Sequence, residues 1–98
     1  MFIEFACFDV SSDSEYTEIC CFYGIRYNRQ GFAVLSTEHR AHDYLLPMNR
    51  ENYDRLEKEI SDALTGQHLV LQGTVYRVRR GAFLPVEKKV SQVYHLMN

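Results

Sequence analysis

The sequence predicts an α+β domain, with a mostly antiparallel sheet of about five strands and one amphipathic helix, about residues 49–65, packed on one face. Residues 49–65 carry apolar side chains at helical spacing between helix start and stop signals. Several other runs alternate apolar and polar side chains and are separated by turn-forming residues. The 98 residues are expected to form a single globular domain, residues 1–98, with one modest core.

The helix is predicted from its two ends and its apolar stripe. Pro47 favours an extended residue before it, and Asn49 is a good N-cap because its side chain accepts from free N–H groups. Gly66 is expected to end the helix in the left-handed conformation. The other face carries charges in i,i+4 pairs. The stripe consists of Tyr53, Leu56, Ile60, Ala63 and Leu64.

Two strands are expected in the first part of the chain. Residues 2–10 alternate, but Phe2 and Phe8 make the second face apolar too, which is typical of a central strand buried on both sides. Residues 17–27 form the second strand. Its residues at period two that share one face are Ile19, Cys21, Tyr23, Ile25 and Tyr27.

A hairpin is predicted at residues 28–31, because two apolar runs are joined there by four residues that end in glycine. The third strand is residues 32–35, and residues 43–46 form a short fourth strand beside it. Between them, residues 36–42 are either a polar loop or one helical turn.

Residues 68–79 form the next extended run, interrupted by Gly73. A bulge at Gly73 would place Leu69, Leu71, Tyr76 and Val78 on one face and leave Val75, Arg77 and Arg79 outside. The alternative is a tight turn between two short strands. Pro85 makes residues 82–86 an edge strand or a loop, and residues 90–97 alternate as a last strand would.

Compartment is predicted from hydropathy and cysteines. No apolar run is long enough for a membrane span, and the start Met-Phe-Ile-Glu is unlike a secretory signal. Cys7, Cys20 and Cys21 are an odd number with an adjacent pair, which is a poor disulfide framework. We therefore expect reduced thiols in a cytoplasmic protein.

Charge is distributed unevenly along the chain. Residues 1–24 contain five acids and no lysine or arginine, whereas residues 74–98 contain five bases and one acid. The sequence thus predicts an acidic pole and a basic pole on the outside of the domain.

Two clusters of reactive side chains have a simpler interpretation. His39 and His42 have a spacing that would suit zinc, but no paired ligand motif accompanies them, so a solvated loop is favoured. Cys20 or Cys21 with a histidine could form a nucleophilic pair, but both lie in a predicted strand with nothing to lower a thiol pKa. We therefore expect no enzyme activity, no metal and no cofactor.

The predicted function is a small protein-binding inhibitor or adaptor that attaches to a protein or a protein complex, with homodimerisation through the two poles as an alternative. Small compact domains of this kind are often encoded by phages or plasmids and act on a host complex. The predicted contact residues are Asp9, Asp13, Glu15, Tyr16 and Glu18 of the acidic loop and Arg77, Arg79 and Arg80 of the basic edge.

A nucleic-acid-binding module is the alternative function, because arginine suits phosphate and tyrosine stacks on bases. It would use the basic strand 75–80 and two lysines downstream, and its affinity would fall steeply with salt. The residues concerned are Tyr76, Arg77, Arg79, Arg80, Lys88 and Lys89.

Overall fold

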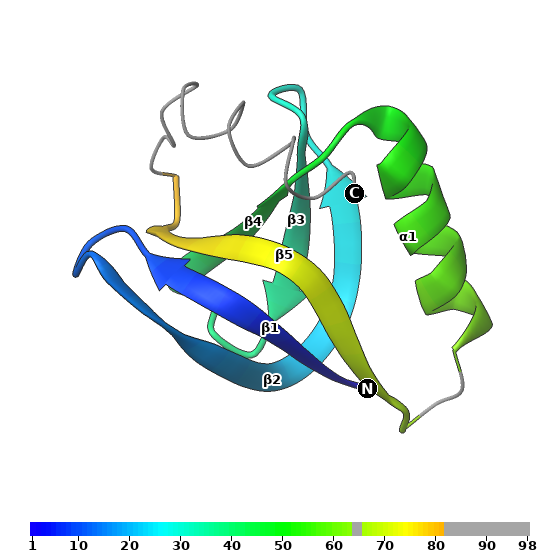
Figure 1. Cartoon of the computed structure of the whole chain (residues 1–98), viewed down its shortest axis with the longest axis horizontal. Coiled ribbons are helices and arrows are strands. Elements are labelled where there is room, and N and C mark those ends of the chain that lie inside the picture. Colours follow the sequence, from blue (N-terminus) through cyan, green and yellow to red (C-terminus); the bar gives the residue numbers. More distant parts are fainter. Residues whose placement is uncertain (64–65, 82–98) are drawn as a thin grey trace.

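Five strands form a closed barrel with one helix alongside in the computed structural model, which describes residues 1–63 and 66–81 (Figure 1). The predicted α+β class, with a mostly antiparallel sheet and a single helix, is confirmed. In chain order the elements are β1 (Phe2–Asp9), β2 (Ser14–Tyr27), β3 (Phe32–Thr37), β4 (His42–Pro47), α1 (Arg50–Asp62) and β5 (His68–Arg79).

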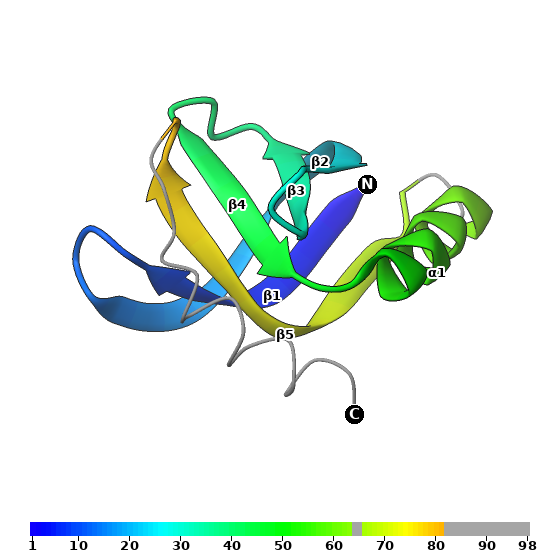
Figure 2. The ribbon, with the colours of Figure 1, turned by 90° about the horizontal axis from the view of Figure 1, so that it is seen from above.

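Consecutive strands pair antiparallel, and β5 closes the barrel by pairing parallel with β1. The parallel closure follows from the strand number, because each antiparallel step reverses direction and the fifth strand then runs the same way as the first. Seen from above, β5 runs beside β1 (Figure 2). The pairing places Asp9 directly opposite Arg77, although 68 positions of the chain separate them.

Two apolar clusters lie on opposite faces of the curved sheet. One fills the barrel interior and extends under the helix, and includes Ile3, Phe5, Cys7, Cys20, Phe22, Ala33, Leu35, Tyr44, Leu46, Leu71 and Val75. The other lies on the opposite face of β3, β4 and β5, because neighbouring residues in a strand point to opposite sides. It consists of Phe32, Val34, Leu45, Tyr76 and Val78.

The helix begins as predicted and ends earlier. Asn49 caps it, accepting a hydrogen bond from the Asn52 N–H at 2.8 Å. It ends at Asp62, because Ala63 has extended backbone angles. Gly66 does have a positive φ of 87°, but it lies beyond residues 64–65, which are outside the described part. Gly66 therefore does not directly follow the last helical turn.

The helix rests on the barrel through few side chains. Tyr53 is its buried residue, and its ring packs against the ring of Tyr27 at 5.0 Å. The Tyr53 hydroxyl donates to Glu57 at 3.0 Å, while Leu56 and Ile60 are partly buried against the interior cluster. The helix thus covers the end of β2 rather than the whole sheet.

The prediction that Ile19, Cys21, Tyr23, Ile25 and Tyr27 share one face of β2 is wrong over the first half of the strand. Cys20 and Phe22 point into the barrel, while Ile19 and Tyr23 are exposed. A bulge at Tyr23, where two steps along β2 match one step along β3, reverses the alternation, so that Ile25 and Tyr27 then face inward. Counting every second residue back along β2 from Tyr27 and Ile25 therefore leads to residues that point outward.

Gly73 lies in a bulge, with a φ of 94°, and β5 continues through it. The predicted consequence for side chains is nevertheless wrong. Two steps along β1, from Glu4 to Ala6, match four along β5, so an even number of residues is inserted and the alternation is preserved. Val75 consequently points inward with Leu71, and Tyr76 and Val78 lie on the opposite face.

The remaining local predictions agree with the structure where it describes them. Asn28 closes the hairpin by accepting from the N–H groups of Gln30 and Phe32, both at 3.0 Å, and Gly31 has a φ of 85°. Residues 38–41 form a loop, and β4 pairs antiparallel with β3. The predictions for residues 82–86 and 90–97 lie outside the described residues.

Candidate functional site

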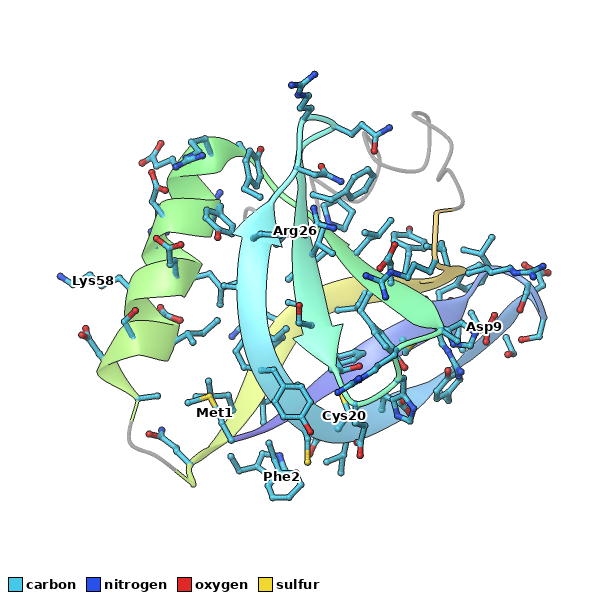
Figure 3. The ribbon with its side chains drawn as sticks, turned by 180° about the vertical axis from the view of Figure 1, so that it is seen from behind. Met1, Phe2, Asp9, Cys20, Arg26 and Lys58 are labelled. Carbon is cyan, nitrogen blue, oxygen red and sulfur yellow. The ribbon has the colours of Figure 1, made fainter. Side chains whose placement is uncertain are left out.

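The outward face of β2, β1 and β5 carries large apolar side chains that the fold leaves uncovered. Phe2 is 49% exposed, Ile19 55% and Val70 65%. Cross-strand pairing holds them together, since Glu4 lies opposite Ile19 on one side and opposite Val70 on the other. We call Phe2, Glu4, Ile19, Cys21 and Val70 the outer patch. Phe2 projects from the barrel at one end of β1, and Asp9 lies at the other end (Figure 3).

The surroundings of the outer patch are acidic. Glu4 lies in its centre, and its Oε1 atom is 3.0 Å from Nε2 of His68. Glu15 lies on the same face of β2, four residues before Ile19, and is exposed. Residues 1–24 contain no lysine or arginine, so no positive side chain from β1 or the first half of β2 offsets these carboxylates.

The predicted acidic loop is divided between two environments. Asp13 and Glu15 are exposed, and Asp13 has a positive φ of 55° in the turn between β1 and β2. Asp9 instead folds back onto the loop, where its Oδ1 accepts from the Ser11 hydroxyl at 2.6 Å and the Ser11 N–H at 2.9 Å. These hydrogen bonds, that from the Ser11 hydroxyl foremost, lower the pKa of Asp9.

The predicted separation of acidic and basic poles is wrong at the mouth of the barrel. Arg77 donates to the Tyr16 hydroxyl at 3.0 Å and contacts His42 Nδ1 at 3.2 Å. Its guanidinium also lies 3.8 Å from Asp9 Oδ2. Closure of the barrel by β5 against β1 causes this contact, so these acidic and basic residues neutralise each other within one chain.

A buried tyrosine holds Glu18 in the same region. The Tyr44 hydroxyl donates to Glu18 Oε1 at 3.0 Å, and the Tyr44 side chain is fully buried. Burial, followed by the hydrogen bond to Glu18, raises the pKa of Tyr44. His39 Nε2 lies 3.4 Å from the same carboxylate oxygen. Glu18 therefore supports the barrel wall and faces away from the outer patch.

The basic edge is also divided. Tyr76 is buried among the apolar residues of β3 and β4 and has its ring 5.9 Å from Phe8, so it does not offer a free face. Arg77 is engaged at the barrel mouth, whereas Arg79 and Arg80 are exposed. Lys88 and Lys89 lie outside the described residues.

The three thiols are free cysteines, with Cys7 and Cys20 buried and Cys21 partly exposed. Burial raises the pKa of Cys7, and it raises the pKa of Cys20 to about 12. A thiol with a raised pKa is protonated at neutral pH and is a poor nucleophile.

The histidine cluster does not assemble a metal site in the described part of the chain. His39 approaches Glu18 and Glu38, whereas His42 contacts Arg77, so the two rings have different partners. Within residues 1–63 and 66–81, no group of three or more His, Cys, Asp or Glu side chains is placed to hold a metal ion. In that same part of the chain, no helix has the length and apolar character to cross a membrane.

No protein-family model, curated protein sequence or solved structure matches this chain. The candidate site is therefore defined by exposure, charge and geometry alone.

Sequence reasoning missed the outer patch because it placed Phe2 on a buried strand face and grouped Ile19 with Ile25 and Tyr27 on one face of the second strand. A signal was present, since residues 2–8 and 19–23 are apolar at nearly every position. A strand that is apolar on both faces usually has both faces covered, and the helix and the barrel interior of the described residues leave the outward face of β1 and β2 exposed. The surplus indicates an exposed apolar surface.

Proposed function

We propose that this protein is a non-enzymatic binding module, an inhibitor or adaptor that attaches to another protein through the outer patch. The observation that supports the proposal is the exposure of Phe2, Ile19 and Val70 around Glu4 on the outward face of β2, β1 and β5. Folded chains expose single apolar side chains commonly, whereas contiguous ones mark binding surfaces. Burial of each side chain against a partner would contribute about 1.5–3 kcal/mol.

Charge indicates the kind of partner. The patch has Glu4 in its centre and Glu15 nearby, and Asp13 extends the acidic surface beyond the strands. A matching partner surface has a basic group opposite Glu4, apolar side chains around that group and further basic groups at the rim, because complementary charge favours encounter and suppresses wrong pairings. A second copy of this chain is disfavoured as the occupant, since pairing two outer patches would bring two base-free segments 1–24 together.

The roles predicted from sequence are reassigned accordingly. Asp13 and Glu15 are exposed and are proposed to steer the partner toward the patch. Asp9, Tyr16, Glu18 and Arg77 stabilise the barrel mouth instead of contacting the partner. The exposed Arg79 ends β5 and the exposed Arg80 follows it in the turn, away from the patch residue Val70.

The compartment we propose is the cytoplasm. Three free cysteines support this, because reducing compartments keep such thiols unpaired.

The test compares capture of a partner by patch variants and by a charge-matched control. Tagged wild type, Ile19→Lys, Val70→Lys and Ser61→Lys are each used as bait in extracts of the source cells, with quantitative mass spectrometry. Ser61 is exposed on α1, so its change adds the same charge away from the patch. We expect a protein that is retained by wild type and Ser61→Lys, is lost by both patch variants, and is released by salt.

Two results would contradict the proposal. One is equal capture by all four baits. The other is a concentration-dependent dimer of the wild-type chain that Ile19→Lys abolishes, because a second copy would then be the occupant.

A further inference from the structure

A second surface feature is an open hollow of about 450 Å³ between β2, the end of β3, the start of β4 and the turn after β5. Arg26 from β2, Arg40 from the loop 38–41 and Arg80 from the turn after β5 all line it. Arg26 is labelled on β2 in Figure 3. A hollow of this volume is in the range that small-molecule ligands occupy.

The fold builds this hollow by separating two strands. Pairing of β3 with β4 stops at Leu35 and Tyr44, and the strands continue apart to Thr37 and His42. The loop between them is fastened to the turn after β5, since the Arg80 N–H donates to the Ala41 carbonyl at 3.0 Å. The arginines of the hollow therefore project from anchored backbone.

Positive charge is concentrated in the hollow. Among the residues that the structure describes, three arginines and one carboxylate line it, and the Oδ2 atom of that carboxylate, Asp43, accepts from the Gly81 N–H at 3.4 Å. Within residues 1–63 and 66–81, none of the three guanidinium groups has an ion-pair partner within 4.0 Å. Uncompensated arginines around a polar hollow are the arrangement that binds phosphate, because guanidinium donates to phosphate in a bidentate fashion.

An exposed aromatic ring stands at the same hollow. Tyr23 lines it and is 70% exposed, because the bulge in β2 turns this residue away from the core. An exposed tyrosine beside arginines suits a nucleobase, which stacks on an aromatic face while its phosphate contacts the cations. Arg40, Arg80 and Tyr23 come from three segments that the sequence does not place together.

We propose that this hollow binds a nucleotide unit, with its phosphate held by Arg26, Arg40 and Arg80 and its base stacked on Tyr23. The unit is part of a single-stranded nucleic acid or is a free nucleotide, and the two sources share this chemistry. The site uses none of the outer patch residues, so it does not depend on the protein-binding proposal. Several residues were predicted from the sequence to bind nucleic acid. Of those that the structure describes, Arg80 is the one that lines this hollow.

The test is fluorescence anisotropy with a 5′-labelled oligothymidylate of about twelve nucleotides, a length in the range that small barrels cover. Wild type is expected to bind with an affinity that falls as salt rises. Arg26→Ala and Arg40→Ala should each weaken binding and reduce the log–log salt slope by about 0.7–1. Tyr23→Ala should weaken binding roughly tenfold with the slope unchanged.

Arg55→Ala is the matched control, because Arg55 is an exposed arginine on α1 whose ion pair, 3.7 Å to Glu51, lies outside the hollow. It should bind as wild type does. Competition with millimolar thymidine monophosphate separates the sources: displacement of the probe identifies a free nucleotide, and persistence of the complex identifies the strand. Absence of salt-dependent binding of the oligothymidylate, or equal affinities for Arg26→Ala, Arg40→Ala and Arg55→Ala, would overturn the proposal.

Discussion

Arg77 and Arg79 are two residues apart on β5, yet the structure predicts opposite consequences for replacing them. Arg77 crosses the barrel mouth to Tyr16 and His42, while Arg79 is exposed at the strand end. The informative perturbation is Arg77→Met, which keeps an unbranched side chain and removes the hydrogen-bonding head. Arg79→Met is its control.

The magnitude follows from the contacts of Arg77. Two hydrogen bonds from a charged donor contribute about 3–6 kcal/mol together. The Arg77 Nε atom is buried with no hydrogen-bond partner in the described part of the chain, and removing it recovers about 1–3 kcal/mol of desolvation. Subtracting the central values of these two ranges gives a net loss in the free energy of unfolding of about 2.5 kcal/mol, whereas an exposed substitution such as Arg79→Met should change it by less than about 0.5 kcal/mol.

Urea unfolding followed by circular dichroism measures both variants. With an m-value of about 1 kcal/mol/M, the midpoint of Arg77→Met should fall by about 2.5 M while that of Arg79→Met stays near wild type. Equal midpoints for the two variants would refute the placement of Arg77 inside the barrel mouth.

Three further predictions concern the cap, the acidic turn and the thiols. Asn49→Ala removes the acceptor at the start of α1 and should lower the free energy of unfolding by about 1 kcal/mol in urea titrations, with no loss if the cap is unimportant. Hydrogen bonding to the serines that follow lowers the pKa of Asp9, so its stabilisation is present above about pH 4 and is lost as pH falls through the folded-state pKa. Asp9→Asn should thus be less stable than wild type at pH 7. In thermal melts the difference in Tm between the two proteins should become smaller in acid, and a larger difference would contradict this. Iodoacetamide at pH 8 should label Cys21 well before Cys7 and Cys20, because burial raises the pKa of both Cys7 and Cys20. Mass spectrometry measures the labelling of each thiol, and equal rates for all three would contradict this.

Local chemistry predicted the parts of the fold that depend on neighbours in the sequence. The Asn49 cap and the Asn28–Gly31 hairpin both form as expected, because each rests on hydrogen bonds between residues a few positions apart. The end of the helix was less determined. Ala63 leaves the helical conformation before the glycine that was expected to terminate it.

Side-chain direction was harder to predict, because it depends on how many residues a bulge inserts. One extra residue at Tyr23 inverts the first half of β2, whereas two extra residues near Gly73 leave β5 unchanged. Sequence alternation alone does not distinguish an odd insertion from an even one. Ile19 was therefore placed on the same face of β2 as Ile25 and Tyr27.

Barrel closure was the other missing element. Pairing of β1 with β5 joins residues from the two ends of the described chain and has no local signal in either strand. It places Asp9 beside Arg77, which removes the expected separation of charge at that point. Charge counted along a sequence gives the sign of each segment, while the topology decides which segments meet.

Methyl NMR of the protein mixed with its captured partner is the most direct test of the outer patch as a protein-binding surface. The exposed methyl groups of Ile19 and Val70 should shift and broaden, while those of Ile3 and Val75, fully buried in the barrel interior, should keep their positions. Unchanged signals from Ile19 and Val70 in a formed complex would contradict the account.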